Sequence, residues 1–404
     1  AAEGHAELLR LLVDHGGDPD REDRYGNTPR GIAQAVGTAI HDKDLRKWLS
    51  WDKVPQKVLD PATAHWVQDK YAGSGWSNHE LANPSSASSS ASSPGDGAGW
   101  TARCDIDMYM YWEVTPEEIY QRYVMMNRPV LLRRLNENST AWDAYHKTEI
   151  TRRFGSERVH VSDIPYNVKF GSQNGEDLLL AEYLDEVNQG RVSGGKHPWY
   201  VFKGNPVPLA AKNTSIVAPS VVQTPDFMYE VFRHNRNSGR RFPDDGAHDT
   251  PSSPEIQREL DRREPFVNLQ WALGVAGSGA PVHFHNTAWN SLFYGRKHWY
   301  IYPPSRNLMG KKQTLLWVEE DLEDLKAQGY LPYECTQEPG DVLIVPELWG
   351  HAVLNVRDSV AVATEVAGSN FRPAKLPRAF GDVSGTRKGG GGRRKPEGRP
   401  RPPR

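Results

Sequence analysis

Cysteine is almost absent from this sequence, because only Cys104 and Cys335 occur among its 404 residues. Two cysteines exclude a domain held by a disulfide framework, and no Cys-x-x-Cys pair indicates a zinc site. Whether the two form a single bridge stays open from the sequence. No apolar run approaches the ~20 residues that a membrane-spanning helix needs, so we expect no membrane partner.

Several catalytic motifs are missing as well. The sequence has no Gly-x-x-x-x-Gly-Lys-Ser/Thr phosphate loop, no Gly-x-Ser-x-Gly elbow and no His-Glu-x-x-His pair, which argues against the enzyme classes that these motifs mark. The formal net charge is −2, so the body gives no sign of binding nucleic acid. Residues 373–404 form a basic Gly/Pro/Arg-rich tail that cannot make a core. A disordered tail is expected, with RNA contact or nuclear import as alternatives.

The first 53 residues resemble partial ankyrin repeats. Residues 8–12, LLRLL, have helical spacing, and Asn27-Thr28-Pro29 would open a helix of a second, degenerate repeat. About three repeats are needed for stability, so we expect further repeats upstream of this sequence. Ankyrin repeats usually bind proteins, which predicts a protein substrate or partner. An ordinary helical hairpin is the alternative.

A linker separates this segment from the rest of the chain. Residues 54–99 have no clear pattern and end in a Ser/Ala/Gly stretch at 83–99 that is too poor in apolar residues to pack. The composition becomes globular at Trp100, and residues 100–372 are assigned to one domain. Within it we predict helices beginning at Thr115 and over 178–187 and 318–328, strands over 128–132 and 199–202, and a barrel core over 265–366.

Two stretches of that domain bring three histidines into one pattern. In residues 268–304, His283 and His285 stand two apart in an apolar, aromatic strand, so their side chains leave the same face. Residues 339–351 then give a turn, an apolar strand and His351. Two ligands on one strand and a third on a distant strand are typical of a β-barrel that closes on one metal ion.

Four motifs follow one another in a specific order: NRPVLLRRL, GVAGSGAPVHFH, YGRKHWYIYPP and ECTQEPGDVLIVPELWGHAVLNV. Together they resemble the JmjC (jumonji C) oxygenases of the cupin-like class, over roughly residues 100–372. The resemblance implies a mainly β fold, a double-stranded β-helix or jelly-roll core with flanking helices, to which the ankyrin-like segment adds a small all-α part. It also implies hydroxylation of a protein side chain that depends on Fe(II) and 2-oxoglutarate.

The metal site departs from the pattern of that family at one position. JmjC oxygenases have His-x-Asp/Glu followed by a distal His, and this sequence matches at His283 and His351 but has His285 in place of the carboxylate. The site is therefore one negative charge short. Three histidines hold zinc in other proteins, and imidazole suits Fe, Zn, Cu and Ni alike. The alternative is that the three are buried, hydrogen-bonded histidines without a metal.

Three residues match positions that bind the co-substrate in the family. Lys297 would pair with the distal carboxylate of 2-oxoglutarate, because a buried cation is tolerated when it has a counter-charge. Asn290 lies seven residues earlier, and Thr364 fits a hydroxyl position near the end of the domain, although one insertion shifts the register. The alternative for Lys297 is a solvated lysine at a strand end.

Three functions remain in competition at this point. The first is a hydroxylase-like JmjC protein. The second is an inactive cupin-like pseudoenzyme that acts with the ankyrin repeats as a protein-interaction module, and the third is a three-histidine dioxygenase that does not use 2-oxoglutarate. The compartment stays open, because an ankyrin segment favours the cytoplasm or nucleus whereas the family resemblance also allows the lumen of the endoplasmic reticulum.

Overall fold

The computed structural model describes residues 29, 69–76, 80–82, 100, 104–124, 127–165, 175–188, 198–206, 216, 226–232, 266–304 and 308–366. The predicted ankyrin repeats, apart from Pro29, and the basic tail at 373–404 lie outside these residues. None of the helices within them is long and apolar enough to cross a membrane.

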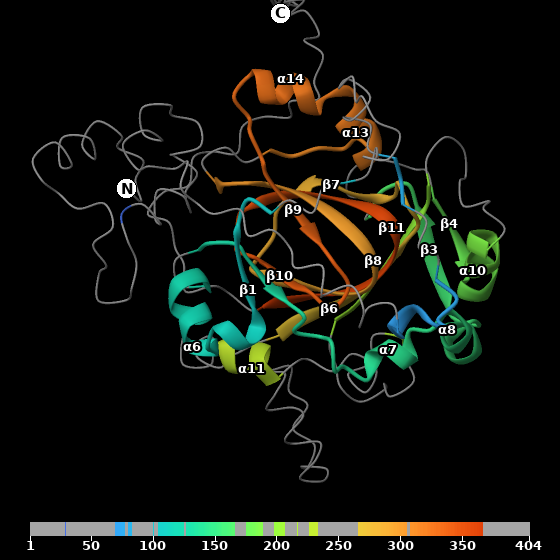
Figure 1. Ribbon diagram of the computed structural model, residues 1–404. Helices are drawn as coiled ribbons and strands as arrows, with labels where there is room; N and C mark the ends of the chain where they lie inside the picture. Colours follow the sequence, from blue (N-terminus) through green and yellow to red (C-terminus); the bar gives the residue numbers. More distant parts are fainter. Residues whose placement is uncertain are drawn as a thin grey trace, which may run out of the picture.

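Eleven strands of the described chain form one continuous hydrogen-bonded sheet (Figure 1). The main order is β1-β2-β10-β8-β11-β6-β5-β3-β4, while β7 pairs with β11 and β9 pairs with β8. The strands are β1 (Asp107–Met110), β2 (Val130–Arg133), β3 (Arg158–Ser162), β4 (Gly175–Leu179), β5 (Tyr200–Pro206), β6 (Phe266–Gly274), β7 (Gly279–His283), β8 (Ala288–Tyr302), β9 (Tyr333–Gln337), β10 (Val342–Val345) and β11 (Gly350–Val366). This mainly β architecture is consistent with a jelly-roll core.

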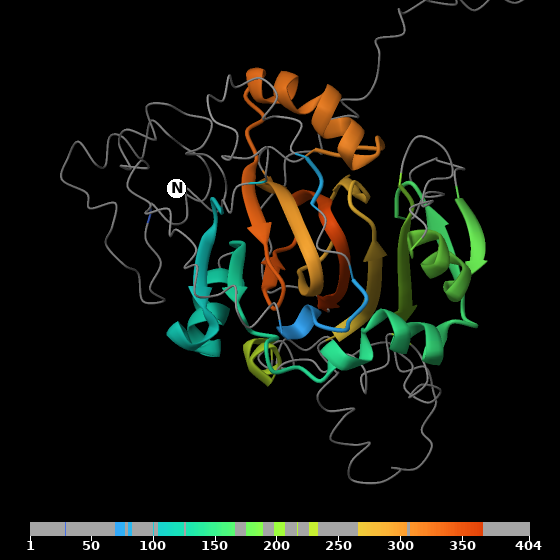
Figure 2. The ribbon, with the colours of Figure 1, turned by 45° about the vertical axis from the view of Figure 1, so that its right-hand side comes forward.

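The two longest strands, β8 and β11, pair antiparallel over most of their length and lie side by side within the sheet (Figure 2). One half of β8 also pairs with β10 and the other with β9, while β11 pairs with β7 at its start and with β6 at its end. The ladder breaks opposite Gly295, whose φ is 91°. A Cβ there would collide with the backbone of Asp358 and Ser359, so only glycine allows the close approach.

Short helices flank the barrel at its edges (Figure 1). Helix α6 (Pro116–Ile119) has Thr115 as its N-cap, as predicted, and Glu118 N–H donates to Thr115 Oγ1 at 3.2 Å. It continues as the π-helical turn η5 (Tyr120–Val124) and follows the 3₁₀ turn η4 (Tyr111–Glu113). The others are α7 (Ala141–Ala144), α8 (Lys147–Phe154), α10 (Leu180–Asn188), α11 (Asp226–Phe232), α13 (Thr314–Glu320) and α14 (Leu322–Ala327).

Residues upstream of Trp100, where the sequence predicted the barrel domain to begin, pack onto its outer face. Tyr71 and Trp76 are buried in the largest apolar cluster, and Tyr71 accepts a hydrogen bond from Gly295 N–H. Leu81 N–H donates to Val356 O at 2.8 Å, which ties its backbone to the middle of β11. The interval 54–99 therefore contains two segments, 69–76 and 80–82, that contribute to the folded core.

Cys104 and Cys335 form a disulfide across 231 residues of sequence. The two residues also make an antiparallel β-bridge, which ties the segment before β1 to strand β9. The sequence left this bridge open, and the structure contains it. Closing so long a loop restricts the unfolded chain, so the bridge stabilises the barrel.

Candidate metal centre and co-substrate cavity

Three histidines converge at one end of the barrel. His283 is the last residue of β7 and pairs in register with His351 near the start of β11, while His285 follows in the turn toward β8. The ring nitrogens that could bind a metal all lie within 4.8 Å of one another. The structure thus brings together the three residues that the sequence proposed as ligands, from two strands and one turn.

Backbone carbonyls fix the orientation of each ring. Nδ1 of His283 lies 2.7 Å from Pro281 O, Nδ1 of His285 lies 2.6 Å from Asn286 O, and Nδ1 of His351 lies 3.0 Å from Trp349 O. A carbonyl oxygen only accepts, so each Nδ1 carries the proton and donates it. Each Nε2 then keeps its lone pair, which is the arrangement that supporting contacts give to metal-binding histidines.

Burial keeps two of these rings neutral at ordinary pH. It lowers the pKa of His283 from 6.5 to about 4, with a further lowering by the nearby His285. It also lowers the pKa of His351 well below its usual value, and both other histidines act in the same direction. Neutral imidazoles are the form that binds metals, so the donor set fits a divalent cation.

No carboxylate of the described residues completes this cluster. In the family pattern an acid stands at the position that His285 occupies in this chain. An acid contacts this turn only through the residue after His285: the side-chain amide of Asn286 donates to Glu365 Oε1 at 2.7 Å. Imidazole ligands alone suit zinc, copper, nickel and iron, and so the donor chemistry does not select one of them.

Lys297 lies in the same cavity as the three histidines. The cavity has a volume of about 400 Å³, and Lys297 is only 1% exposed. Its Nζ donates to Asn355 Oδ1 at 2.6 Å and lies 5.9 Å from the ring centre of Tyr200. Burial lowers its pKa from 10.5 to about 7. No carboxylate in the described part of the chain pairs with it, and its polar partner is the neutral amide of Asn355.

The other two predicted co-substrate residues have different positions. Asn290 lines the cavity, and its Oδ1 is buried without a hydrogen-bond partner. Thr364 is buried but does not line the cavity, whereas Ala363 and Glu365 on either side of it do. Side chains alternate along a strand, so Thr364 faces away. The cavity therefore brings together His283, His285, His351, Lys297 and Asn290, and leaves Thr364 outside.

Sequence reasoning did not identify Asn355, Tyr200 or Glu365 as residues of this site. Asn355 and Tyr200 contact Lys297 from β11 and β5, which are distant in sequence, and no local motif marks either one. Glu365 could have been found by counting alternate residues along β11, because His351, Val353 and Ala363 also line the cavity.

Comparisons with known proteins agree with this geometry. Residues 270–366 match the family model described as JmjC domain, hydroxylase. The chain is 27% identical over 266 residues to JmjC domain-containing protein 8 of Mus musculus, covering 65% of this chain and 82% of that protein. It is 32% identical over 270 residues to the bifunctional arginine demethylase and lysyl-hydroxylase psr-1 of Caenorhabditis elegans, covering 62% and 58%.

A more distant relative is the arginine-specific demethylase JMJ20 of Arabidopsis thaliana, 21% identical over 277 residues, with 62% of this chain and 54% of that protein covered. The cavity, the histidine cluster and these matches together support the JmjC family for this chain. Oxygenases of this family generally use Fe(II) and 2-oxoglutarate.

Proposed function

We propose that this protein is a JmjC-type oxygenase that uses Fe(II) and 2-oxoglutarate to hydroxylate a protein side chain. One observation carries the proposal: the three Nε2 lone pairs and the unpaired Lys297 share one cavity. A site for a metal and a site for an anion therefore adjoin each other. Backbone carbonyls hold the histidine rings and the Asn355 amide holds Lys297, so none of the four side chains has an anionic partner among the described residues.

Each residue would have a defined role. His283, His285 and His351 would hold the metal through Nε2, with their rings fixed by the three backbone carbonyls. Lys297 would bind the distal carboxylate of 2-oxoglutarate, and the amide of Asn290 would form a hydrogen bond with the co-substrate. A bound Fe(II) with 2-oxoglutarate supplies the activation of O2 that such hydroxylations need.

An anaerobic titration of the full chain with Fe(II) and 2-oxoglutarate tests this assignment. A chelated iron–oxoacid pair gives a visible charge-transfer band. We expect a saturable band that is lost in Lys297→Ala and in His283→Ala. Lys311→Ala and His160→Ala are the matched controls and should keep the band, because neither residue lines the cavity. The absence of a band in the wild-type protein at any iron concentration would reject the oxygenase.

A second candidate function is supported by His285. A histidine in place of the acid removes one negative charge from the metal site, which weakens its attraction for a dication. The protein would then be a pseudoenzyme in which the barrel serves as an interaction module. The substitution His285→Asp discriminates the two: a charge-transfer band in the variant, with none in the wild type, would favour the pseudoenzyme.

A further inference from the structure

A single carboxylate lines the cavity that contains the three histidines. Glu365, near the end of β11, is half-buried and is the only acid among the described residues of the cavity wall. It does not belong to the group of three residues whose ring nitrogens lie within 4.8 Å of one another. Glu365 therefore stands beside the candidate metal site without being one of its direct ligands.

Backbone contacts from both ends of β11 hold the turn that carries His285. Just before the strand begins, Leu348 N–H donates to His285 O at 3.1 Å. At the other end of the strand, Val366 N–H donates to Thr287 O at 2.9 Å. The backbone alone therefore keeps Glu365, the neighbour of Val366, close to this turn.

The side chain of Asn286 fixes the position of the carboxylate. Its Nδ2 donates to Glu365 Oε1 at 2.7 Å, and the backbone carbonyl of the same residue lies 2.6 Å from Nδ1 of His285. One residue thus contacts both the acid and a candidate metal ligand. Because the amide is neutral, this contact leaves the negative charge of Glu365 in place.

Carboxylates elsewhere on the barrel are neutralised by arginines. Glu80, for example, lies 2.9 Å from Arg296 and 2.6 Å from Arg357. The carboxylate of Glu365 has the Asn286 amide as its hydrogen-bond partner within the described chain. A half-buried charge is stabilised by an opposite charge nearby, and a divalent cation in the histidine cluster supplies that charge in the same cavity.

The other charged group of the cavity wall, Lys297, is held at a different place. Its Nζ donates to Asn355 Oδ1 at 2.6 Å, and the two residues are partners in the β8–β11 ladder. In the same ladder Glu365 pairs with Ala288, at the beginning of β8. The carboxylate therefore lies on the side of the metal-binding turn, and the lysine on the side that the proposed function assigns to the co-substrate.

We propose that Glu365 supplies, from outside the set of direct ligands, the negative charge that the metal site lacks at His285. This inference rests on the metal site of the proposed function and adds to it the source of the charge balance. Three neutral imidazoles together with Glu365 carry one negative charge, as do the two histidines and one acid of the family pattern. Coulomb attraction acts across several ångströms in a cavity of low dielectric, so the carboxylate has no need to coordinate. Asn286 is the positioning residue that holds it beside the turn.

Titration of the full chain with Co(II), without 2-oxoglutarate, tests this proposal. The visible absorption of bound Co(II) gives the affinities of the wild type, Glu365→Gln, Glu365→Asp and Glu319→Gln. Glutamine removes the charge but keeps the length of the side chain and an oxygen that accepts from Asn286, whereas aspartate keeps the charge and shortens the side chain. Glu319 is exposed on α13 and does not line the cavity, so Glu319→Gln matches the change in net charge.

A role of Glu365 through its charge and a role through its shape predict opposite rankings. We expect Glu365→Gln to weaken Co(II) binding roughly tenfold, which is typical of a group that supports metal ligands. Glu365→Asp and Glu319→Gln should stay within about threefold of the wild type. If Glu365 only holds Asn286 in place, Glu365→Asp loses affinity and Glu365→Gln keeps it. That ranking overturns the proposal, as do equal losses in both variants, unchanged affinity in both, or no Co(II) binding by the wild type.

The potential of bound iron is a readout that a purely structural role would not move. A negative charge near the metal favours Fe(III) over Fe(II), because the more highly charged ion gains more Coulomb energy. Glu365→Gln should therefore raise the Fe(III)/Fe(II) midpoint potential, by about 59 mV for each tenfold loss in relative affinity for Fe(III). Glu365→Asp should keep the wild-type potential. An unchanged or lowered potential in Glu365→Gln overturns the proposal.

The proposed function fails or stands on a different measurement, the charge-transfer band that requires 2-oxoglutarate. A band in the wild type, together with unchanged Co(II) affinity and potential in Glu365→Gln, rejects the role of Glu365 alone. The expected losses in Glu365→Gln without a band in the wild type support the role of Glu365 and reject the oxygenase alone.

Discussion

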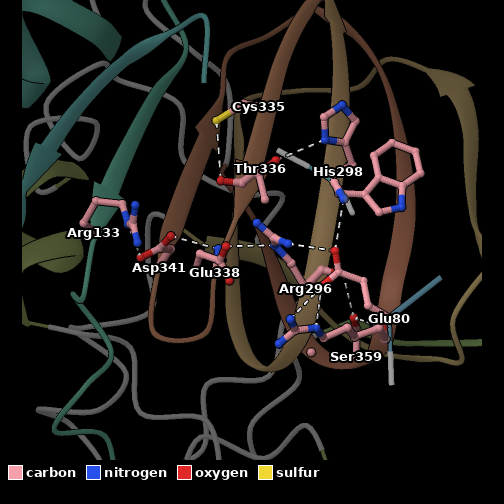
Figure 3. A network of polar contacts seen from close by, with 12 residues as sticks. Glu80, Arg133, Arg296, His298, Cys335, Thr336, Glu338, Asp341 and Ser359 are labelled. Carbon is pink, nitrogen blue, oxygen red and sulfur yellow. Dashed lines mark hydrogen bonds and ion pairs between the residues drawn. The ribbon is translucent and has the colours of Figure 1, made fainter. Parts of the chain in front are cut away.

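Arg296 and Lys297 are neighbours on β8, yet their side chains lie in opposite electrostatic settings. Arg296 belongs to the polar network of Figure 3, here called the outer network, whose charged members are Glu80, Arg133, Arg296, Glu338, Asp341 and Arg357. In it, Arg296 lies 2.9 Å from Glu80 Oε1 and 2.8 Å from Glu338 Oε1. Lys297 faces the cavity, where its contacts are a neutral amide and an aromatic ring. The alternation of one strand therefore separates a cation that pairs with two carboxylates from a cation that has no anionic partner among the described residues.

The same contrast extends to the acids and amides of the two regions. In the outer network, Asp341 is fully buried and pairs with Arg133 at 2.8 Å, and also accepts from the backbone N–H groups of Arg134 and Glu338 (Figure 3). In the cavity, Oδ1 of Asn290 has no partner. Buried polar groups are normally satisfied, so the open Oδ1 of Asn290 is available to a ligand that enters the cavity.

The largest expected effect comes from removing a histidine from the cavity. We expect His351→Ala to weaken the binding of Co(II) by roughly 100-fold or more, because it removes a direct ligand rather than a supporting contact. The visible absorption of bound Co(II) measures this affinity. His160→Ala is the control, since that residue lies on β3, contacts Asp177 of β4 and does not line the cavity. Unchanged affinity in His351→Ala would mean that the cluster does not bind the metal.

Replacing the unpaired lysine should stabilise the protein while abolishing its proposed ligand binding. The pKa of Lys297 falls from 10.5 to about 7 on burial, and each pKa unit corresponds to about 1.4 kcal/mol. Lys297→Met should therefore raise the free energy of unfolding by several kcal/mol at pH 6, and 2-oxoglutarate should no longer bind. Urea unfolding and calorimetric titration measure the two effects.

The sign of the pH dependence follows from the same shift. Between about pH 7 and pH 10.4 the unfolded chain holds more protons at this lysine than the folded chain, so wild-type stability rises with pH across that window. The advantage of Lys297→Met should shrink over the same range. Lys311→Met is the exposed control. A stability difference that does not vary with pH would contradict the burial of a charged lysine.

Breaking the outer network should have a smaller effect of the opposite sign. Burial alone would raise the pKa of Glu80, but Arg296 and Arg357 outweigh it and lower that pKa. Glu80→Gln leaves these two arginines short of an anion, so we expect the free energy of unfolding at pH 7 to fall by about 1–3 kcal/mol. Because the folded pKa is lowered, the loss should diminish as the pH falls below the ordinary carboxyl pKa and disappear below the lowered pKa of the folded protein.

Glu80→Gln also tests whether the outer network and the cavity have separate roles. Glu80 lies outside the cavity, so Glu80→Gln should leave the affinities for Co(II) and 2-oxoglutarate within about twofold of the wild type. Thermal or urea unfolding gives the stability, and the titrations above give the affinities. A loss of ligand binding with unchanged stability would reverse the roles assigned to the two regions.

The sequence predicted the parts of this site that depend on local alternation. His283, His285 and Lys297 lie on or next to strands whose pattern sends them inward, and the structure places all three in the cavity. It did not predict that Tyr71 and Glu80 pack onto the barrel, because their partners are more than 200 residues away in the chain. The disulfide between Cys104 and Cys335 stayed open for the same reason.

The assignment of Thr364 to the cavity failed for a different reason. Its assignment relied on the family resemblance, with one insertion shifting the register, whereas the ladder between β8 and β11 contains irregularities between Asn355 and Ala361. Despite them, Val353, Ala363 and Glu365 all line the cavity, so the alternation that begins at His351 is preserved over the strand. Counting by twos from His351 would have selected Ala363 and placed Thr364 on the opposite face.

The smallest expected effect therefore belongs to Thr364. Thr364→Val keeps the shape of a side chain that is 2% exposed and does not line the cavity, so the affinity for 2-oxoglutarate should change by less than about twofold. Asn290→Leu, on the cavity wall, should weaken it by about tenfold, because the lost amide is one hydrogen bond to the co-substrate. Calorimetric titration with Zn(II)-loaded protein compares the two. If Thr364→Val produced the larger loss, its hydroxyl would reach the co-substrate, and the end of β11 would have to turn by one residue when the ligand binds.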